Sequence, residues 1–492
     1  MKLLTRGFSA TYEIESLTRM LFSGAQRVPD QSPPARGDWI LAEMAPDGGS
    51  CRLSVTVSLG GTMRTAQSAA PMRMTEKERT FPLCRLLYET VCGMTGETLR
   101  WGLLTGIRPI KLFHRLAADG LDDKKIADRM REKYLLSQEM TDLALQVRCA
   151  EDAVNRKSVP NGFSLYISVP FCPQRCSYCS FVSSAVERMR PLIPAYVEHL
   201  CREITATAAI ANDLGLLLQT VYIGGGTPTT LEASQLARII ESVRRSFDCS
   251  GLLEFTVEAG RPDTIDRARL AALREGGVDR ISVNPQTMND RVLALVGRKH
   301  TADDVLHAYA LAREIGFSCI NMDLIAGLAD ETPEEFLVSL SRVMALQPEN
   351  ITVHALTLKR ASTIVYDGEA ERLYRRRSDA ARMVDEGRTA LMQAGWFPYY
   401  LYRQKNTVGA LDNTGYAKKG SEGIYNVLIM DETQTIFACG AGAVTKLRNP
   451  YGEEIKRIFN YKFPAEYMER FDEMLRRKDQ VKQFYEACLS KP

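Results

Sequence analysis

Apolar and polar positions alternate in one rhythm from about residue 164 to residue 358. Short runs of apolar and β-branched residues recur there, and each is followed by a stretch whose apolar residues repeat at helical spacing. The runs are almost continuously apolar, as strands buried on both faces of a parallel sheet tend to be. The pattern predicts six strands, at 164–171, 220–226, 254–259, 280–286, 320–328 and 351–358.

Amphipathic helices are predicted between these strands, for example at 231–247, 301–317 and 332–346. Thr301 and Thr332 open two of them as capping residues, with acidic residues in the first turn. Six consecutive strand–helix units predict an α/β fold, a partial (β/α)6 TIM-like barrel, with reactive groups at the carboxyl ends of the strands.

The residues outside this segment follow other patterns. An alternating run at 51–59 and helical stretches after it predict an N-terminal α+β domain, and the polar stretch 155–162 is the expected linker. A long charged helix is expected around 371–394, then a tyrosine-rich region, and the last forty residues are expected to be helical and exposed. Three domains result: an N-terminal α+β domain at 1–160, the barrel at 161–370, and a C-terminal α+β extension at 371–492 that covers the substrate.

The composition narrows the class of protein only slightly. A chain of 492 residues exceeds what one hydrophobic core usually supports, and a net charge of +3 gives no reason to expect nucleic acid as a partner. Neither a signal peptide nor 18 consecutive apolar residues is found, so a cytoplasmic protein without a membrane span is expected. Nine of the twelve cysteines are scattered singly and are interpreted as reduced, packed thiols.

The other three cysteines stand together directly after the first strand. The string YISVPFCPQRCSYCSF (166–181) places Cys172, Cys176 and Cys179 at the spacing CxxxCxxC. Three thiolates from one tight loop can hold three corners of a [4Fe–4S] cluster and leave the fourth iron open. That iron can chelate S-adenosylmethionine (SAM), whose reductive cleavage yields a 5′-deoxyadenosyl radical.

Two other interpretations of the three cysteines are weaker. A zinc knuckle needs a fourth ligand at suitable spacing, and the nearest histidine, His199, is predicted to lie in mid-helix. Three coincidental core cysteines would not share a loop with polar residues such as Gln174 and Arg175. The cluster is therefore the favoured interpretation.

With GGGTP at 224–228, the cysteine string resembles the oxygen-independent coproporphyrinogen III oxidase family of radical SAM enzymes. The strings WGLLTGIRPIK (101–111) and YRQKNTVGALDNTGYAKKGSEGIYNVLIM (402–430) narrow the resemblance to the HemZ group of coproporphyrinogen dehydrogenases. Glu258, read alone, is either a charge at a helix N-terminus or an acceptor for ribose hydroxyls, and the resemblance favours ribose. The SAM contacts that the resemblance implies are Tyr166, Tyr178, Ser180, Gly225, Gly226, Thr227, Glu258, Gln286, Arg298, Asp323, Thr357 and Val444.

For two of these residues a structural interpretation competes. Arg298 stands beside Lys299 and His300 and could belong to a solvated basic loop, and Tyr166 could be a core aromatic. The chain also departs from the best-known oxidases at two positions: Phe181 replaces a fourth cysteine, and Ser168 replaces a histidine. The heme-chaperone branch of the family lacks that cysteine too.

A tetrapyrrole with four propionates requires cationic anchors and flat apolar walls. The candidates are Lys359, Arg360, Arg403, Lys405, Arg108 and Lys111, with Tyr399, Tyr400 and Tyr402 interleaved, although any one of them alone could be solvated surface. The resemblance implies oxidative decarboxylation of coproporphyrinogen III to protoporphyrinogen IX, with electrons from a low-potential reductant such as flavodoxin or ferredoxin. The alternatives are a heme-binding chaperone and a radical SAM enzyme with another substrate.

Overall fold

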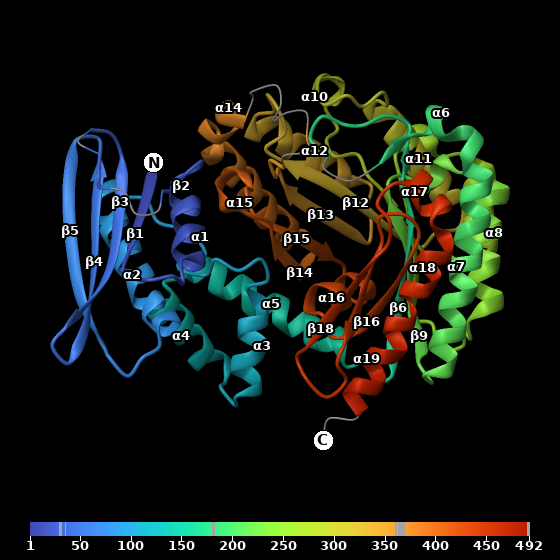
Figure 1. The fold of residues 1–492 in the computed structure, drawn as a ribbon. Coiled ribbons are helices and arrows are strands. Elements are labelled where there is room, and N and C mark those ends of the chain that lie inside the picture. The colour runs from blue at the N-terminus through green and yellow to red at the C-terminus, as the bar shows by residue number, and fades with distance from the viewer. Residues whose placement is uncertain (29–31, 35, 180–182, 360–361, 363–369, 490–492) are drawn as a thin grey trace. The chain divides into compact units, whose positions relative to one another are not determined.

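The computed structural model describes residues 1–28, 32–34, 36–179, 183–359, 362 and 370–489 (Figure 1). The chain forms two compact units. The first consists of residues 1–145 and 403–410, and the second of residues 146–402 and 411–492. The second unit contains the three clustered cysteines.

The first unit is built on a five-stranded sheet, in the order β2-β1-β3-β4-β5. Its core lies between β4 and the helices α1 and α2, because Leu53, Val55 and Val57 alternate along β4 toward that side. The predicted alternating run at 51–59 is thus confirmed as a strand. The strands are β1 (Lys2–Arg6), β2 (Gln26–Arg27), β3 (Trp39–Asp47), β4 (Ser50–Leu59) and β5 (Thr62–Pro71); the helices are α1 (Tyr12–Leu21), α2 (Glu76–Thr95), α3 (Ile110–Ala118) and α4 (Asp123–Tyr134), followed by α5 (Gln138–Asn155), which continues into the second unit.

Six parallel strands form the centre of the second unit, and all six were predicted from the apolar runs. In space they follow the order β13-β12-β11-β10-β9-β6, with helices between them along the chain (Figure 1). The strands are β6 (Gly162–Val169), β9 (Leu217–Gly225), β10 (Glu254–Gly260), β11 (Arg280–Val283), β12 (Cys319–Ala326) and β13 (Asn350–Ala355). The connecting helices are α7 (Ile193–Asp213), α8 (Ala233–Ser246), α9 (Arg267–Glu275), α10 (Asp290–Leu295), α11 (Ala302–Ile315) and α12 (Pro333–Ala345).

Later strands extend this sheet at both edges to eleven strands. At one edge β16 (Thr435–Cys439) runs parallel to β6, and β17 (Val444–Arg448) and β18 (Ile455–Phe459) follow in antiparallel order. At the other edge β15 (Asp412–Ala417) pairs antiparallel with β13, and β14 (Phe397–Arg403) lies beyond it. The helices α14 (Ala370–Arg375) and α15 (Arg377–Gln393) precede β14. The sequence did not predict that these strands would continue the barrel sheet.

The predicted helix caps are present in the structure. The hydroxyl of Thr301 accepts a hydrogen bond from the backbone N–H of Asp304, and the Asp304 carboxylate accepts one from the N–H of Thr301. Thr332 and Glu335 make the same reciprocal pair at the start of α12. Each pair satisfies donors that a helix N-terminus otherwise leaves without partners.

A buried carboxylate anchors α16 (Ile424–Asp431) at the amino end of β10. Glu254 accepts hydrogen bonds from the N–H groups of Ile424, at 2.6 Å, and Tyr425, at 3.3 Å. The negative charge thus faces the positive end of the helix dipole, and Arg280 lies 3.5 Å from the same carboxylate. Tyr425 then stacks on Tyr222 of β9, with ring centroids 4.5 Å apart.

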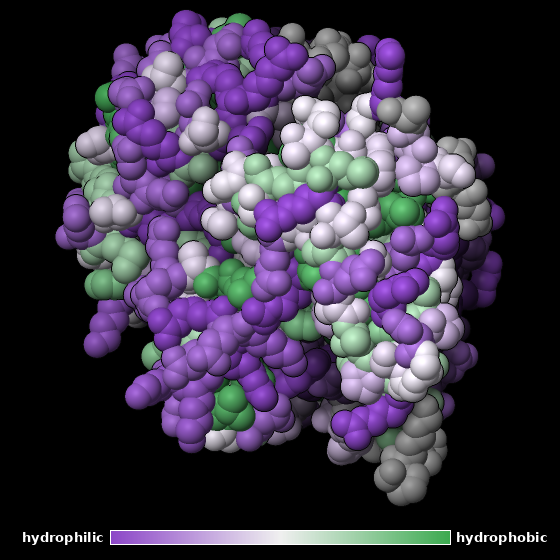
Figure 2. Space-filling model, turned by 90° about the vertical axis from the view of Figure 1, so that its left-hand side faces the viewer, coloured by the Kyte–Doolittle hydropathy of each residue, from purple (hydrophilic) through white to green (hydrophobic). Residues whose placement is uncertain are grey.

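The last forty residues were predicted to be helical, and this is confirmed only from residue 464 onward, because β18 precedes the helices. The helices are α17 (Pro464–Glu469), α18 (Phe471–Arg477) and α19 (Asp479–Leu489). The predicted exposure is wrong, because each helix buries apolar side chains, among them Tyr467, Met474 and Val481. In the described ranges, no helix combines the length and the apolar character needed to cross a membrane. On the face shown in Figure 2, hydrophilic side chains predominate and hydrophobic ones form small patches.

Candidate functional site

The three clustered cysteines lie on the loop that follows β6. This loop begins with β7 (Phe171–Cys172), which pairs in parallel with β8 (Ser184–Ala185), ahead of the short helix α6 (Val186–Met189). A backbone hydrogen bond from Cys179 to the carbonyl of Cys176, at 3.1 Å, folds the loop back on itself. None of the three cysteines forms a disulfide. Three reduced thiols therefore come from one short loop at the carboxyl end of a parallel strand.

The side chain of Cys172 is partly buried. Burial raises the pKa of Cys172, whereas a contact with the hydroxyl of Thr227, with Sγ and Oγ1 3.5 Å apart, acts to lower it. Metals bind the thiolate form of cysteine, so metal binding at this loop would release the proton.

The glycines of the string GGGTP let the carboxyl end of β9 pack closely against the start of the cysteine loop. The N–H of Gly226 donates to the carbonyl of Val169, at 2.9 Å, and the N–H of Thr227 donates to that of Phe171, at 2.7 Å. A Cβ atom on Gly226 would lie 2.5 Å from the carbonyl oxygen of Phe171, which is too close for any other residue. Gly225 has φ +109°, a conformation that favours glycine. In this structure the glycines thus allow two backbone segments to approach each other.

Glu258 on β10 accepts a hydrogen bond from the hydroxyl of Tyr222, with 2.6 Å between the oxygens. Burial raises the pKa of Glu258 to about 7, and repulsion from Asp323 adds to the rise, whereas the Tyr222 hydroxyl opposes it. Tyr166 stacks on Tyr222 with ring centroids 6.2 Å apart. A carboxyl group that titrates near neutrality therefore lies beside Tyr222, which was not predicted as a site residue and which stacks on the predicted cofactor residue Tyr166.

Gln286 and Asp323 are joined through their backbones. The N–H of Gln286 donates to the carbonyl of Asp323, and the N–H of Ile325 donates to the carbonyl of Gln286, both at 2.9 Å. Gln286 has φ +69°, a strained conformation for a residue with a side chain. Its side-chain oxygen Oε1 is buried and has no hydrogen-bond partner among the described residues. A buried acceptor of this kind fits a ligand that carries hydrogen-bond donors.

Asp323 itself is held in the charged form. Its carboxylate accepts a hydrogen bond from Asn321 at 2.7 Å, and the Nε2 atom of His354 lies 3.7 Å from its other oxygen. Burial acts to raise the pKa of Asp323, but His354 and Asn321 outweigh it and lower the pKa below its usual value.

Arg298 is buried, so the alternative of a solvated basic loop is wrong. Its guanidinium donates to the hydroxyl of Tyr178 at 3.2 Å and to the carbonyl of Asn284 at 2.6 Å. Burial acts to lower the pKa of Arg298, whereas Tyr178 and Cys176 raise it, and the net shift is upward. Arg298 and Tyr178 thus form a connected pair next to the cysteine loop.

The remaining predicted contacts have weaker links to this group. The hydroxyl of Thr357 donates to the carbonyl of Ala355 just beyond β13, at 3.3 Å, and Val444 is the first residue of β17. Ser180 and Phe181 lie outside the described residues. The role of each stays a prediction.

Several predicted substrate anchors have structural roles instead. Tyr399 and Tyr400 are buried in a core cluster of the second unit, and Arg403 is buried in the first unit, where it donates to the carbonyl of Leu104. Lys405 is exposed and Tyr402 is partly exposed, so both stay candidates for contact with a substrate. Arg360 lies outside the described residues. Burial lowers the pKa of Lys359, whereas Cys179 opposes this shift.

Sequence reasoning missed Arg261 and His354, which contact members of the site. Arg261 follows the apolar run of β10 directly, and His354 interrupts the apolar run of β13. The rule that drew attention to Glu258, a charged side chain at the end of an apolar strand, would have found Arg261, and a search for ionisable side chains within apolar strands would have found His354.

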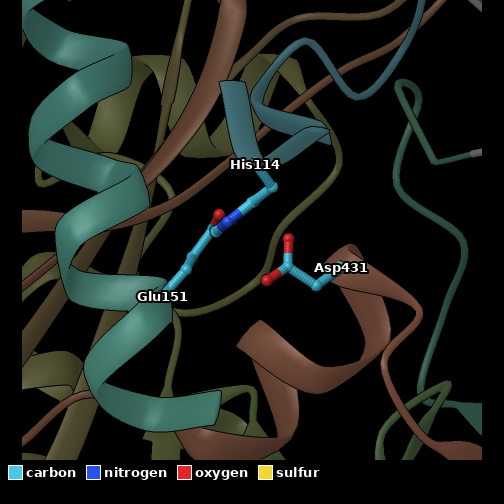
Figure 3. Close-up of side chains that lie close together, drawn as sticks. All are labelled: His114, Glu151 and Asp431. Atoms are coloured by element: carbon cyan, nitrogen blue, oxygen red, sulfur yellow. The ribbon is translucent and has the colours of Figure 1, made fainter. Parts of the chain in front are cut away.

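A buried pair of carboxyl groups, also missed, links α5 to α16 in the second unit. Figure 3 shows Glu151 on α5 and Asp431 at the end of α16. Burial raises the pKa of Glu151 well above its usual value, and Asp431 adds to the rise through its charge and a hydrogen bond. Asn155 donates to Asp431 at 2.7 Å. Glu151 therefore keeps its proton to a higher pH than an exposed glutamate.

Residues 166–341, which include the cysteine loop and most of the parallel strands, match the radical SAM superfamily. The chain is therefore a radical SAM protein, of the class that uses a [4Fe–4S] cluster and SAM. Over 387 residues it is 38% identical to the oxygen-independent coproporphyrinogen-III oxidase-like protein HemZ of Bacillus subtilis strain 168, across 77% of this chain and 76% of that protein. The chain belongs to the HemZ-type family of oxygen-independent coproporphyrinogen III oxidase-like proteins.

Two further similarities bear on the fold and on the range of functions among the relatives. The heme chaperone HemW of Haemophilus influenzae is 31% identical over 62% of this chain and 75% of its own length. The structure of the coproporphyrinogen III oxidase HemN from Escherichia coli matches with a TM-score of 0.51 at 24% identity, over 66% of this chain and 72% of that one. The second similarity confirms the predicted fold class.

The described residues fit both cofactors of the class. A [4Fe–4S] cluster that keeps one iron open requires three thiolate ligands, and the loop supplies three thiols. The orphaned oxygen of Gln286 and the carboxylates of Glu258 and Asp323 offer acceptors for the hydroxyl and amino groups of a nucleoside.

Proposed function

We propose that this protein catalyses the oxygen-independent oxidative decarboxylation of coproporphyrinogen III to protoporphyrinogen IX. The observation that carries the proposal is the extent of the likeness to HemZ. It runs over 387 residues, more than twice the length of the segment 166–341 that matches the radical SAM superfamily. The likeness therefore includes residues outside the part of the barrel that serves SAM chemistry in general.

Cys172, Cys176 and Cys179 are the proposed cluster ligands, because none of them is in a disulfide and all three share one loop. The proposed SAM pocket is the group around the strand ends. It consists of Tyr166, Tyr178, Ser180, Gly225, Gly226, Thr227, Glu258, Gln286, Arg298, Asp323, Thr357 and Val444. The contacts of Glu258, Gln286, Arg298 and Asp323 described above support this assignment.

SAM, when bound and reduced through the cluster, supplies a 5′-deoxyadenosyl radical that removes a hydrogen atom from the β-carbon of a propionate. The bond to the carboxylate then breaks, CO₂ leaves, and one electron passes to an external one-electron acceptor as the vinyl double bond forms. Two propionates react in this way. The electron for SAM comes from a low-potential donor of the flavodoxin or ferredoxin kind.

The part of the protein in this reaction is to bind, orient and exclude water. Asp323 is kept charged by His354, and Glu258 is held in place by the hydroxyl of Tyr222. The rings of Tyr166, Tyr222 and Tyr425 stack on one another, and the hydroxyl of Tyr222 joins this stack to Glu258.

The test is an anaerobic assay of the reconstituted full-length protein with coproporphyrinogen III, SAM and a chemical reductant. The product is oxidised to the fluorescent porphyrin and measured, together with 5′-deoxyadenosine. We expect both products, and we expect 5′-deoxyadenosine to depend on the tetrapyrrole. Formation of 5′-deoxyadenosine without protoporphyrinogen would refute the proposed substrate.

A heme chaperone is the second candidate function, supported by the similarity to HemW and by Phe181, which replaces the fourth cysteine. We expect the wild-type protein to form product without a thiol at this position, and Phe181→Cys to be unnecessary for activity. Stoichiometric heme binding in a protein that forms no protoporphyrinogen would favour the chaperone instead.

A further inference from the structure

Arg261 is a buried cation next to the cysteine loop. It follows β10, whose pairing with β11 shifts register between Glu258 and Gly260. Gly260 has φ +65°, so the chain turns sharply there, and the N–H of Arg261 donates back to the carbonyl of Ala259 at 2.8 Å. The side chain of Arg261 is only 4% exposed. The irregularity at the end of β10 thus directs a charged side chain into the protein.

Asp263 fixes the direction of this guanidinium. Its two carboxylate oxygens accept hydrogen bonds from Nε and Nη2 of Arg261, each at 2.9 Å. This two-point contact uses one edge of the planar fork and leaves Nη1 on the other side. Nη1 lies 3.4 Å from the carbonyl oxygen of Gln174 and 4.0 Å from the sulfur of Cys176. The free edge of the guanidinium therefore faces the cysteine loop.

His300, which lies beside Asp263, does not compete for this contact. His300 lies 4.0 Å from Asp263, and burial together with the Arg298 charge lowers the pKa of His300 to about 4, so the imidazole is neutral at pH 7. Neither ring nitrogen of His300 has a hydrogen-bond partner among the described residues. Arg298 is the other buried arginine that interacts with Cys176.

We propose that Arg261, held by Asp263, donates a hydrogen bond to the sulfur of Cys176 and thereby raises the reduction potential of the bound cluster. Arg261 is a positioning residue in this proposal, because it acts through the cysteine. The proposal rests on the proposed function, since it requires Cys176 to be a cluster ligand.

The direction of the effect follows from electrostatics. One-electron reduction of the cluster by an external donor adds a negative charge that is shared by the iron and sulfur atoms. Hydrogen bonds to the sulfurs stabilise that added charge, and such contacts are among the factors that set cluster potentials. Removal of the donor should therefore make the cluster harder to reduce.

The test compares wild type with Arg261→Gln and Arg261→Lys after anaerobic reconstitution. Arg261→Lys keeps the positive charge and leaves Asp263 in place, but a single ammonium group cannot pair with both carboxylate oxygens and also donate to Cys176. The matched control is Arg269→Gln, because Arg269 also pairs with an aspartate, Asp266, yet its Nε donates to the carbonyl of Leu231. Iron and sulfide content and a potentiometric titration followed by electron paramagnetic resonance are measured for each protein.

We expect unchanged iron content in all four proteins and a lower potential in Arg261→Gln and Arg261→Lys alone. A tenfold change in the reduction equilibrium corresponds to about 59 mV for one electron. Equal potentials in wild type and both variants would overturn this inference while leaving the proposed function intact. A wild-type protein that binds no cluster would overturn the proposed function itself. If Arg261→Gln does not fold, the result of Arg261→Lys decides.

Discussion

The Nε2 atom of His354 on β13 lies 3.7 Å from the Oδ2 atom of Asp323 on the neighbouring strand β12. The other ring nitrogen, Nδ1, lies 3.4 Å from the hydroxyl of Tyr402. The imidazole is thus held between a tyrosine and an aspartate of the proposed SAM pocket. This contact is a principal reason why the pKa of Asp323 is low although the carboxyl group is buried.

Substitution of His354 by alanine should make SAM binding more sensitive to acid. Without the imidazole, burial dominates and the pKa of Asp323 rises, so the carboxylate is lost at a higher pH than in wild type. Each unit of this rise weakens SAM binding by up to about tenfold at a pH below both pKa values, and has no effect well above them. The measurement is the SAM dissociation constant of wild type and His354→Ala from pH 8 down to the lowest pH at which the cluster stays intact.

The control for this experiment is His307→Ala, because His307 is exposed on α11. It should leave both the affinity and its pH profile unchanged. Identical profiles for wild type and His354→Ala would contradict the role assigned to His354.

Each of the variants Cys172→Ala, Cys176→Ala and Cys179→Ala should lose the cluster. Three ligands are the minimum for a cluster that keeps one iron open, so the loss of any one leaves too few. Cys201→Ala and Cys319→Ala are the controls, because these cysteines lie on α7 and at the start of β12. Iron and sulfide analysis after anaerobic reconstitution measures the outcome, and full cluster content in any triad variant would refute the ligand assignment.

The six parallel strands could be predicted because buried strands carry a continuous apolar signal in the sequence. The strands at the sheet edges could not, since β15 and β16 are short and the distant segments with which they pair are not visible in a linear pattern. The same reason explains the buried C-terminal helices. Met474 and Val481 look like isolated apolar residues in a charged segment until their partners are known.

The site residues that could be predicted most accurately are those that belong to a motif contiguous in the sequence. The cysteine string and the GGGTP string each occupy one loop, and the structure brings the two loops into contact through hydrogen bonds such as that from Thr227 to Phe171. The tyrosines near residue 400 show the limit of composition. Tyr399 and Tyr400 lie in a tyrosine-rich segment, which suggested a substrate site. In the structure they belong to a core cluster with residues such as Val427 of α16, which is distant in the sequence.

Glu258→Gln should keep the cluster and weaken SAM binding in a manner that depends on pH. The loss of a hydrogen bond to a charged acceptor costs roughly 1.5–3 kcal/mol, or about ten- to hundredfold in affinity. Because the pKa of Glu258 is about 7, wild-type affinity should change across neutrality, whereas the variant should show no such step. Asp323 does not titrate in this range, since its pKa is lowered.

Isothermal titration of the reconstituted proteins with SAM at pH 6, 7 and 8 measures this difference. Parallel pH profiles for wild type and Glu258→Gln would show that Glu258 does not contact SAM as proposed. Loss of iron in the variant would instead show that the residue supports the cluster loop.

The last prediction concerns stability and Glu331, which is fully buried at the start of α12. Its Oε1 accepts a hydrogen bond from the hydroxyl of Thr287 at 2.5 Å, whereas Oε2 has no partner among the described residues. Burial raises the pKa of Glu331 to about 7, and the Thr287 hydroxyl opposes the rise. In the unfolded chain the group titrates near its usual value, so the folded state binds this proton more tightly.

The sign of the pH effect follows from this difference. Below the unfolded pKa both states are protonated and the stability that depends on Glu331 is fully present. It is lost as the pH rises toward and through 7, because folding must then either keep a proton or bury a charge. The difference between the two pKa values corresponds to about 3 kcal/mol at most. Glu331→Gln cannot ionise. The free energy of unfolding of the wild type, relative to that of the variant, should therefore decrease from pH 5 to pH 8.

Urea denaturation of wild type and Glu331→Gln at pH 5 and pH 8 measures this decrease. The comparison uses the change with pH rather than the absolute stabilities, because the glutamine amide lacks a partner at Oε2 and carries its own cost at every pH. Glu334→Gln is the matched control on the same helix. Glu334 is exposed and its pKa is lowered, so it stays ionised across this range in both states. If the stability difference between wild type and Glu331→Gln were the same at both pH values, the carboxyl group of Glu331 would have to be charged in the folded protein, and an unpaired buried charge would then need a cation close to Oε2.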